Sequence, residues 1–168
     1  MQTRRFEIRR ATYDDVDNMA AAHLDSIRSL GARYYPPEIV SAWAALVRPE
    51  LYVNAMNGGE VFYIAVDTDS GAREVLGFSS HRVDGDEHGV GVYVTGSAGR
   101  QGIGSALLRS AEASAAAAGA ERLDIDASLA AVDFYTANGF EEVGRGEHDL
   151  GAGRTMACVF MRKDLQRM

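Results

Sequence analysis

Apolar residues recur at helical spacing near the start of the chain. Thr12 and Asp15 can form a capping box, which predicts a helix that continues to the stop signal at Gly31. A second helix is predicted over Glu38 to Val47, because two prolines precede it and suit a first helical turn. We expect Arg48 to Gly59 to be a connection.

Two further helices are predicted later in the chain. An apolar stripe begins in the glycine-rich segment 99–104 and ends at Gly119, which is typical of an amphipathic helix. A short helix is expected after Ser128, which can cap it, and should pass through Tyr135 and end at Asn138.

Seven runs of alternating or β-branched residues predict strands. They are Phe6 to Arg10, Val61 to Val66, Glu74 to Val83, His88 to Thr95, Leu123 to Ala127, Phe140 to Glu147 and Thr155 to Lys163. The order strand, loop, helix, strand from His88 to Ala127 implies a crossover, so the fourth and fifth strands should be parallel. Seven strands and about four helices predict an α/β fold.

Composition narrows the class of protein. The chain has 168 residues, 46% of them hydrophobic, and a formal charge of -7, which predicts one globular domain over residues 1–168. The acidic balance disfavours nucleic-acid binding. No apolar stretch is long enough for a membrane span, and no apolar segment follows the first arginines, so we expect a soluble cytoplasmic protein with no membrane partner.

The residues offer little support for metal or thiol chemistry. The single cysteine, Cys158, lies in an apolar run and is expected to be a small buried hydrophobe. The four histidines lack helical ligand spacing and there is no second cysteine, so no metal site is predicted.

The most informative segment is a glycine-rich loop before the third long helix. Gly96, Gly99, Gly102 and Gly104 let main-chain amides approach a ligand closely, and the helix N-terminus adds its positive dipole end. A phosphate or pyrophosphate site is therefore predicted. The spacing is not that of a dinucleotide fold, and the only lysine, Lys163, is too far along the chain to form a P-loop.

With these residues the sequence resembles the GNAT superfamily of acetyl-CoA-dependent N-acetyltransferases. Val92 to Leu108 is similar to the family's pyrophosphate-binding motif, and Leu123 to Phe140 is similar to its following motif. The resemblance implies a mixed, mostly antiparallel seven-stranded sheet. It also implies that acetyl-CoA is the cosubstrate and that acetyl passes directly to an amine of a small molecule or peptide.

The resemblance also implies which residues bind the cosubstrate. They are Val92, Tyr93, Val94, Gly99, Arg100, Gln101, Gly102, Ile103, Gly104, Ser105 and Phe134. An amide near Val92 or Tyr93 would meet the thioester oxygen. The chain departs from the family pattern at Gly96, at Gly99, where Arg100 can supply the charge from the next position, and at Ala130, which removes one polar contact.

Tyr135 matches the position of the family's tyrosine that protonates the CoA sulfur. The base is left open by the motif. Asp126 and His81 rank above His88 and His23, and a water chain to solvent is a further alternative.

The acceptor pocket is expected from the first two helices and their connection. The polar and aromatic residues there are His23, Ser26, Arg28, Tyr34, Tyr35 and Trp43. The oligomeric state is left open, with a homodimer as one option. The alternative function is a noncatalytic acyl-CoA-binding or partner-binding module. The departures from the family pattern at Gly99 and Ala130 favour this alternative.

Overall fold

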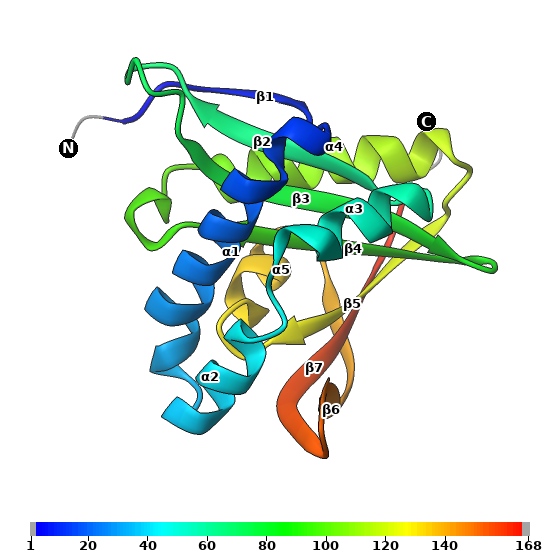
Figure 1. The fold of residues 1–168 in the computed structure, drawn as a ribbon. Coiled ribbons are helices and arrows are strands. Elements are labelled where there is room, and N and C mark those ends of the chain that lie inside the picture. Colours follow the sequence, from blue (N-terminus) through cyan, green and yellow to red (C-terminus); the bar gives the residue numbers. More distant parts are fainter. Residues whose placement is uncertain (1–2, 166–168) are drawn as a thin grey trace.

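The computed structural model of the chain describes residues 3–165, which form one seven-stranded sheet (Figure 1). The strand order is β1-β2-β3-β4-β5-β7-β6. The strands are β1 (Phe6–Arg10), β2 (Val61–Asp67), β3 (Val75–Asp84), β4 (Glu87–Val94), β5 (Arg122–Ser128), β6 (Glu141–Gly151) and β7 (Arg154–Asp164). The predicted mixed, mostly antiparallel sheet is confirmed, because among the strands of residues 3–165 only β4 and β5 pair in parallel.

Helices cover both faces of the sheet. In Figure 1, α1, α2 and α3 lie in front of the sheet and α4 lies behind it. The described α-helices are α1 (Val16–Ser29), α2 (Pro37–Ala44), α3 (Pro49–Asn57), α4 (Ile103–Ala117) and α5 (Val132–Ala137). None of them is long and apolar enough to cross a membrane.

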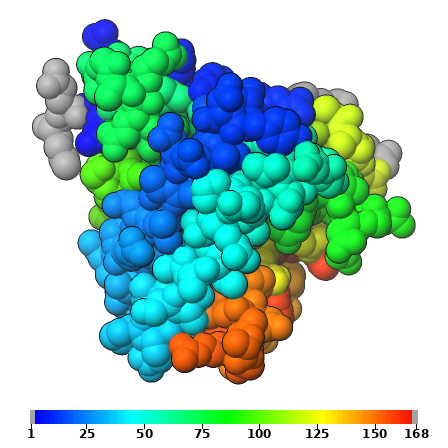
Figure 2. All heavy atoms as spheres, viewed as in Figure 1, coloured from blue at the N-terminus to red at the C-terminus, as the bar shows by residue number. Residues whose placement is uncertain are grey.

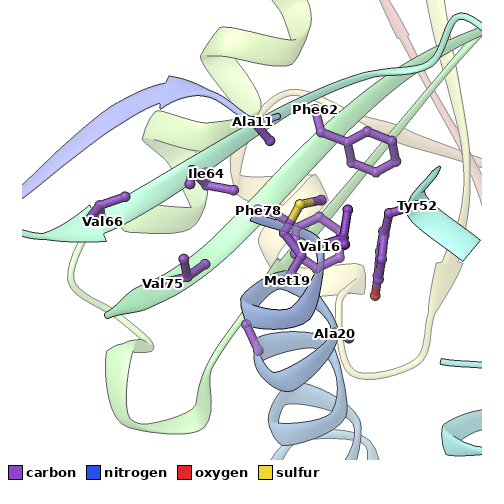
Figure 3. Close-up of a cluster of buried hydrophobic side chains, with 11 residues drawn as sticks. Ala11, Val16, Met19, Ala20, Tyr52, Phe62, Ile64, Val66, Val75 and Phe78 are labelled. Carbon is purple, nitrogen blue, oxygen red and sulfur yellow. The ribbon is translucent and has the colours of Figure 1, made fainter. Parts of the chain in front are cut away.

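The α3 helix corrects one expectation, that residues 48–59 form a connection. Pro49 stands in the first helical turn, where its missing N–H costs no hydrogen bond. Tyr52 is 2% exposed and its ring packs edge-on against Phe62 and Phe78 (Figure 3). Packing of this one face against the sheet stabilises a helix of nine residues that would be marginal alone.

The two helix starts predicted from their caps have different outcomes. The capping box of Thr12 and Asp15 is present, on a short 3₁₀ turn that leads into α1, and the Asp15 carboxylate also pairs with Arg9 at 2.8 Å. The predicted Ser128 cap of α5 is wrong. Ala131 precedes that helix without a side-chain cap, and its N–H bonds to the Ser128 carbonyl in a tight turn.

Each face of the sheet has its own apolar core. On the α1 face, Met19 and Phe78 pack with Ile64 and Tyr52 (Figure 3). On the opposite face, Leu108 and Ala111 of α4 pack against Val90 and Leu123. Successive side chains of β3 and β4 therefore point alternately into one core and into the other.

The parallel pairing of β4 and β5 is short. Its one register pair is Gly89 with Asp124, and β4 continues beyond this point without pairing to β5. The strands diverge toward the start of the glycine-rich loop, and this divergence positions the candidate site.

Candidate active site

The point where β4 and β5 diverge presents a main-chain amide that no neighbouring strand pairs. The Val92 N–H donates to the Tyr135 hydroxyl at 3.1 Å, which is a partner from α5. Successive amides of a strand point in opposite directions, so residues two apart share a direction, and the Thr95 N–H bonds to Leu76 of β3. The Tyr93 amide therefore also points toward β3. Of the two amides considered for the thioester oxygen, the Val92 amide is the one that faces the gap.

Tyr135 is held in place by its surroundings as well as by this hydrogen bond. The residue is 2% exposed, and its ring packs against those of Phe134 and Phe140 with centroid distances of 5.0 and 5.2 Å. Burial raises the pKa of the Tyr135 phenol above its ordinary value. The phenol therefore keeps its proton at neutral pH and remains a proton donor.

The glycine-rich loop leads directly into α4. Gly102 precedes the helix with φ at 80° and Arg100 has φ at 61°, so both residues are left-handed. The first amides of α4 have no partner within the helix, which makes its start a suitable place for an anion. Arg100 is exposed beside it and adds a positive charge.

The remaining residues predicted to bind the cosubstrate differ in whether their main chain or their side chain is available to a ligand. Ile103 is fully buried in the core beneath α4, so only its main chain is available to a ligand. A Cβ on Gly104 would lie 3.0 Å from the Phe134 ring, so the loop, the helix and α5 converge closely there. Gln101 contacts the loop itself through a bond to the Ser97 carbonyl at 3.2 Å. Val94 and Ser105 are half-buried beside these residues.

One contact to the loop was missed in the sequence. The Asp25 carboxylate of α1 accepts the Gly96 N–H at 2.8 Å, across 71 residues of chain. No pattern in the sequence indicates such a pair, because Asp25 reads as one more polar residue on the exposed face of α1.

The candidate bases lie on different faces of the sheet. His81 is on the α4 face, where its Nδ1 lies 3.3 Å from the Ser114 hydroxyl and its Nε2 lies 2.9 Å from Nδ1 of His88. Burial and the neighbouring His88 lower the pKa of His81. The structure pairs these two histidines with each other and not with Tyr135.

Asp126 lies on β5 beyond the last parallel pair and on the face of the sheet opposite Leu123 and Ala127. Two residues earlier, Asp124 pairs with Gly89, so Asp126 lies across the widening gap from Gly91. Its side chain is about half exposed, and Nδ1 of His148 lies 3.6 Å from its carboxylate. Asp126 is therefore open to solvent and to a ligand at the gap.

His23 lies on α1 in the aromatic cluster of the front face. Its Nδ1 is 2.8 Å from the Tyr52 hydroxyl, and its ring centroid is 3.9 Å from that of Tyr93. Burial lowers the pKa of His23 to about 3, so the ring is neutral under ordinary conditions. Burial also raises the pKa of the Tyr93 phenol, to about 12.

The predicted acceptor residues do not all face one pocket. Tyr35 is buried, and its hydroxyl donates to the Ala157 carbonyl at 2.6 Å and accepts the Leu129 N–H at 2.8 Å. It therefore connects the start of α2 to β7 and to the segment after β5. Trp43 is buried beside it, whereas Tyr34 is exposed. Ser26 is buried and Arg28 is exposed on α1.

The site combines a diverging parallel strand pair, a glycine-rich loop that leads into α4 and a buried phenol at the divergence. A family model described as "Acetyltransferase (GNAT) domain" matches residues 32–163. The chain belongs to this GNAT acetyltransferase family. No match was found among the curated protein sequences.

Solved structures agree with this assignment. A GCN5-related N-acetyltransferase from Rhodopseudomonas palustris is 27% identical, with a TM-score of 0.82 over 98% of this chain and 99% of that one. The PaiA N-acetyltransferase of Thermoplasma acidophilum, solved with coenzyme A, is 19% identical, with a TM-score of 0.76 over 96% and 99% of the two chains. A ribosomal-protein-alanine N-acetyltransferase from Brucella melitensis is 25% identical, with a TM-score of 0.67 over 95% and 99%.

Proposed function

We propose that this protein transfers the acetyl group of acetyl-CoA directly to an amine of a small molecule or peptide. The observation that carries the proposal is the hydrogen bond from the Val92 N–H to the Tyr135 hydroxyl where β4 and β5 diverge. This hydrogen bond places an amide donor and a protonated phenol side by side. A thioester needs one group of each kind, for its carbonyl oxygen and for its sulfur.

The remainder of acetyl-CoA has a matching surface. The pyrophosphate would bind at the loop, where Gly102 and Gly104 leave the amides at the start of α4 accessible and Arg100 adds charge. The pantetheine arm would follow the free edge of β4 past Val94 and Tyr93 toward Val92. The protein as a whole is net acidic, so binding of this anionic cosubstrate would depend on these local groups and not on the net charge.

The transfer follows from these positions. The neutral amine attacks the carbonyl carbon, and the Val92 N–H binds the oxygen as it gains negative charge. The C–S bond then breaks, and the departing sulfur takes the Tyr135 proton. The nitrogen loses its extra proton to Asp126, or to water that Asp126 contacts, since this carboxylate lies across the gap from Gly91.

Amine-dependent release of CoA tests the proposal. The protein is incubated with acetyl-CoA and with single amines, including polyamines, aminoglycosides, amino acids and basic peptides. We expect at least one acceptor to release CoA thiol and to gain an acetyl group by mass spectrometry. Saturable acetyl-CoA binding without turnover on any of them would instead favour the noncatalytic module.

A further inference from the structure

Arg82 of β3 is an exposed side chain that lies against Gly89 of β4, near the proposed site. Its guanidinium lies flat against Gly89, because a Cβ added to Gly89 would be 3.0 Å from its Cζ and 3.0 Å from its Nε. A Cβ at this position would require the guanidinium to shift by a few tenths of an ångström. The glycine in this strand therefore makes room for a neighbouring side chain as well as for a ligand.

Arg82 lies on the front face of the sheet, on the side that faces α1, α2 and α3. It pairs with Gly89 across the two strands, as Phe78 pairs with Tyr93, and these residues alternate with those that face α4. Its positive charge lowers the pKa of both Tyr93 and Tyr135, against the larger raising effect of burial. The guanidinium is thus close enough to act electrostatically on the phenol at the reaction point.

This guanidinium has no counter-ion among residues 3–165. The arginines nearby differ, since Arg162 pairs with Asp124 at 2.9 Å and Arg122 pairs with the same carboxylate at 3.6 Å. Asp124, the residue in register with Gly89, is therefore already shared by two other cations. Arg82 remains available to an anion from outside the chain.

The other side of the gap carries the opposite charge. Asp126 lies on β5 across from Gly91, whose front surface is open except for the Ser80 hydroxyl, 3.6 Å from the place that a Cβ would take. In Figure 2 the surface recedes between the atoms of α2 and α3, the green β3–β4 hairpin and the orange β6–β7 hairpin. An acceptor entering there would meet a cation on the β4 side and a carboxylate on the β5 side.

We infer that the acceptor is an amine that also carries an anionic group, a carboxylate in an amino-acid-like molecule, and that Arg82 binds that group. The inference rests on the proposed function. A guanidinium binds a carboxylate with two parallel hydrogen bonds, which would orient the amine toward Val92 and Tyr135 while Asp126 faces the nitrogen. Arg82 is then a specificity-determining residue, because it fixes the acceptor without touching the reacting bond.

Matched acceptor pairs test this inference. Each amino acid is compared with its own amide, which keeps the amine and side chain and removes the negative charge. For the wild type we expect kcat/KM to be about 10 to 100-fold higher for the amino acid than for the amide. For Arg82→Gln we expect this preference for the amino acid over its amide to fall about 10 to 100-fold, through a higher KM for the amino acid.

Two further variants separate recognition from folding. Gly89→Ala leaves Arg82 in the chain and shifts its guanidinium, so the amino-acid KM should rise by less than in Arg82→Gln. Arg10→Gln, at an exposed arginine on β1, is the matched control and should leave every value unchanged. Melting curves of the four proteins establish that each is folded.

The outcomes are distinct from failure of the proposed function. Equal turnover of amino acids and amides by the wild type, or an equal loss for both in Arg82→Gln, overturns the role of Arg82 and leaves the acetyltransferase intact. If no acceptor releases CoA, amino acids are titrated into the CoA-saturated protein and the Gly91 amide resonance is followed. Absence of any binding there overturns the inference as well.

Discussion

The Tyr135 hydroxyl lies 3.1 Å from the main-chain nitrogen of Val92, at the point where two parallel strands separate. The amide is free for this contact because β4 and β5 pair only at Gly89 and Asp124. In the proposed reaction the thioester oxygen would take the place of the phenol on this amide, and the phenol would protonate the sulfur. The proposed chemistry therefore depends on both residues and on the packing that holds them together.

Replacing Tyr135 by Phe should lower kcat by about 100-fold, because the departing thiolate loses its proton donor. The affinity for acetyl-CoA should change little, since the ring and its packing remain. Steady-state CoA release and calorimetric titration with acetyl-CoA measure the two quantities. Tyr13→Phe, at an exposed tyrosine outside the predicted acceptor pocket, is the matched control. Equal kcat in wild type and Tyr135→Phe would remove the acid role.

Gly102→Val should abolish the rise in melting temperature that acetyl-CoA gives to the wild type. The Cβ would be strained at φ of 80° and would stand beside the amides that face the pyrophosphate. Gly85→Val is the matched control, because Gly85 has φ of 61° in the β3–β4 turn, away from the loop. Both variants should lose about 1 to 2 kcal/mol of stability. A full acetyl-CoA shift in Gly102→Val would argue against the loop as the phosphate site.

Asp25→Ala should weaken acetyl-CoA binding about 3 to 10-fold, because the Gly96 N–H loses its carboxylate partner and the loop start becomes less ordered. Binding is measured by calorimetric titration. Asp17→Ala, at an exposed aspartate near the start of the same helix, should bind as the wild type does. Unchanged binding in both variants would show that this contact does not position the loop.

His23 should make the protein less stable in acid. Its folded pKa of about 3 lies below the ordinary value of 6.5, so below pH 6.5 the unfolded chain takes up a proton that the folded protein does not. Between these two values its contribution falls by about 1.4 kcal/mol for each pH unit. Urea unfolding from pH 7 to 4 measures the slope.

A His23→Gln variant removes this titration, so its stability should depend less on pH than that of the wild type. His148→Gln, at an exposed histidine, should keep the wild-type slope. Identical slopes in all three proteins would mean that His23 is protonated in the folded state, contrary to its buried, neutral assignment.

The features that the sequence predicted are those with a local signal. The alternation along β4 and the glycines before α4 lie within short stretches, and the order strand, loop, helix, strand predicted the parallel pairing of β4 with β5. The α3 helix lacked such a signal. Its nine residues form a helix because Tyr52 packs against a sheet that comes later in the chain.

Contacts between distant residues could not be predicted in this way. The choice between the Val92 and Tyr93 amides depends on which neighbour each faces. The sequence ranked His81 above His88 and His23 as a base, but it did not indicate that His81 and His88 lie under α4 while His23 is on the opposite face. The place of Arg82 against Gly89 likewise depends on the register of β3 and β4.

The central claim is that the acetyl thioester binds where Val92 and Tyr135 meet. Titration of the isotope-labelled protein with acetyl-CoA, followed through its assigned amide resonances, tests it most directly. We predict a large, saturable shift of the Val92 amide as its hydrogen bond passes from Tyr135 to the thioester oxygen, together with shifts at Gly102 to Gly104 and none at Gly85. Saturation of the protein by acetyl-CoA with the Val92 amide unmoved would contradict the account.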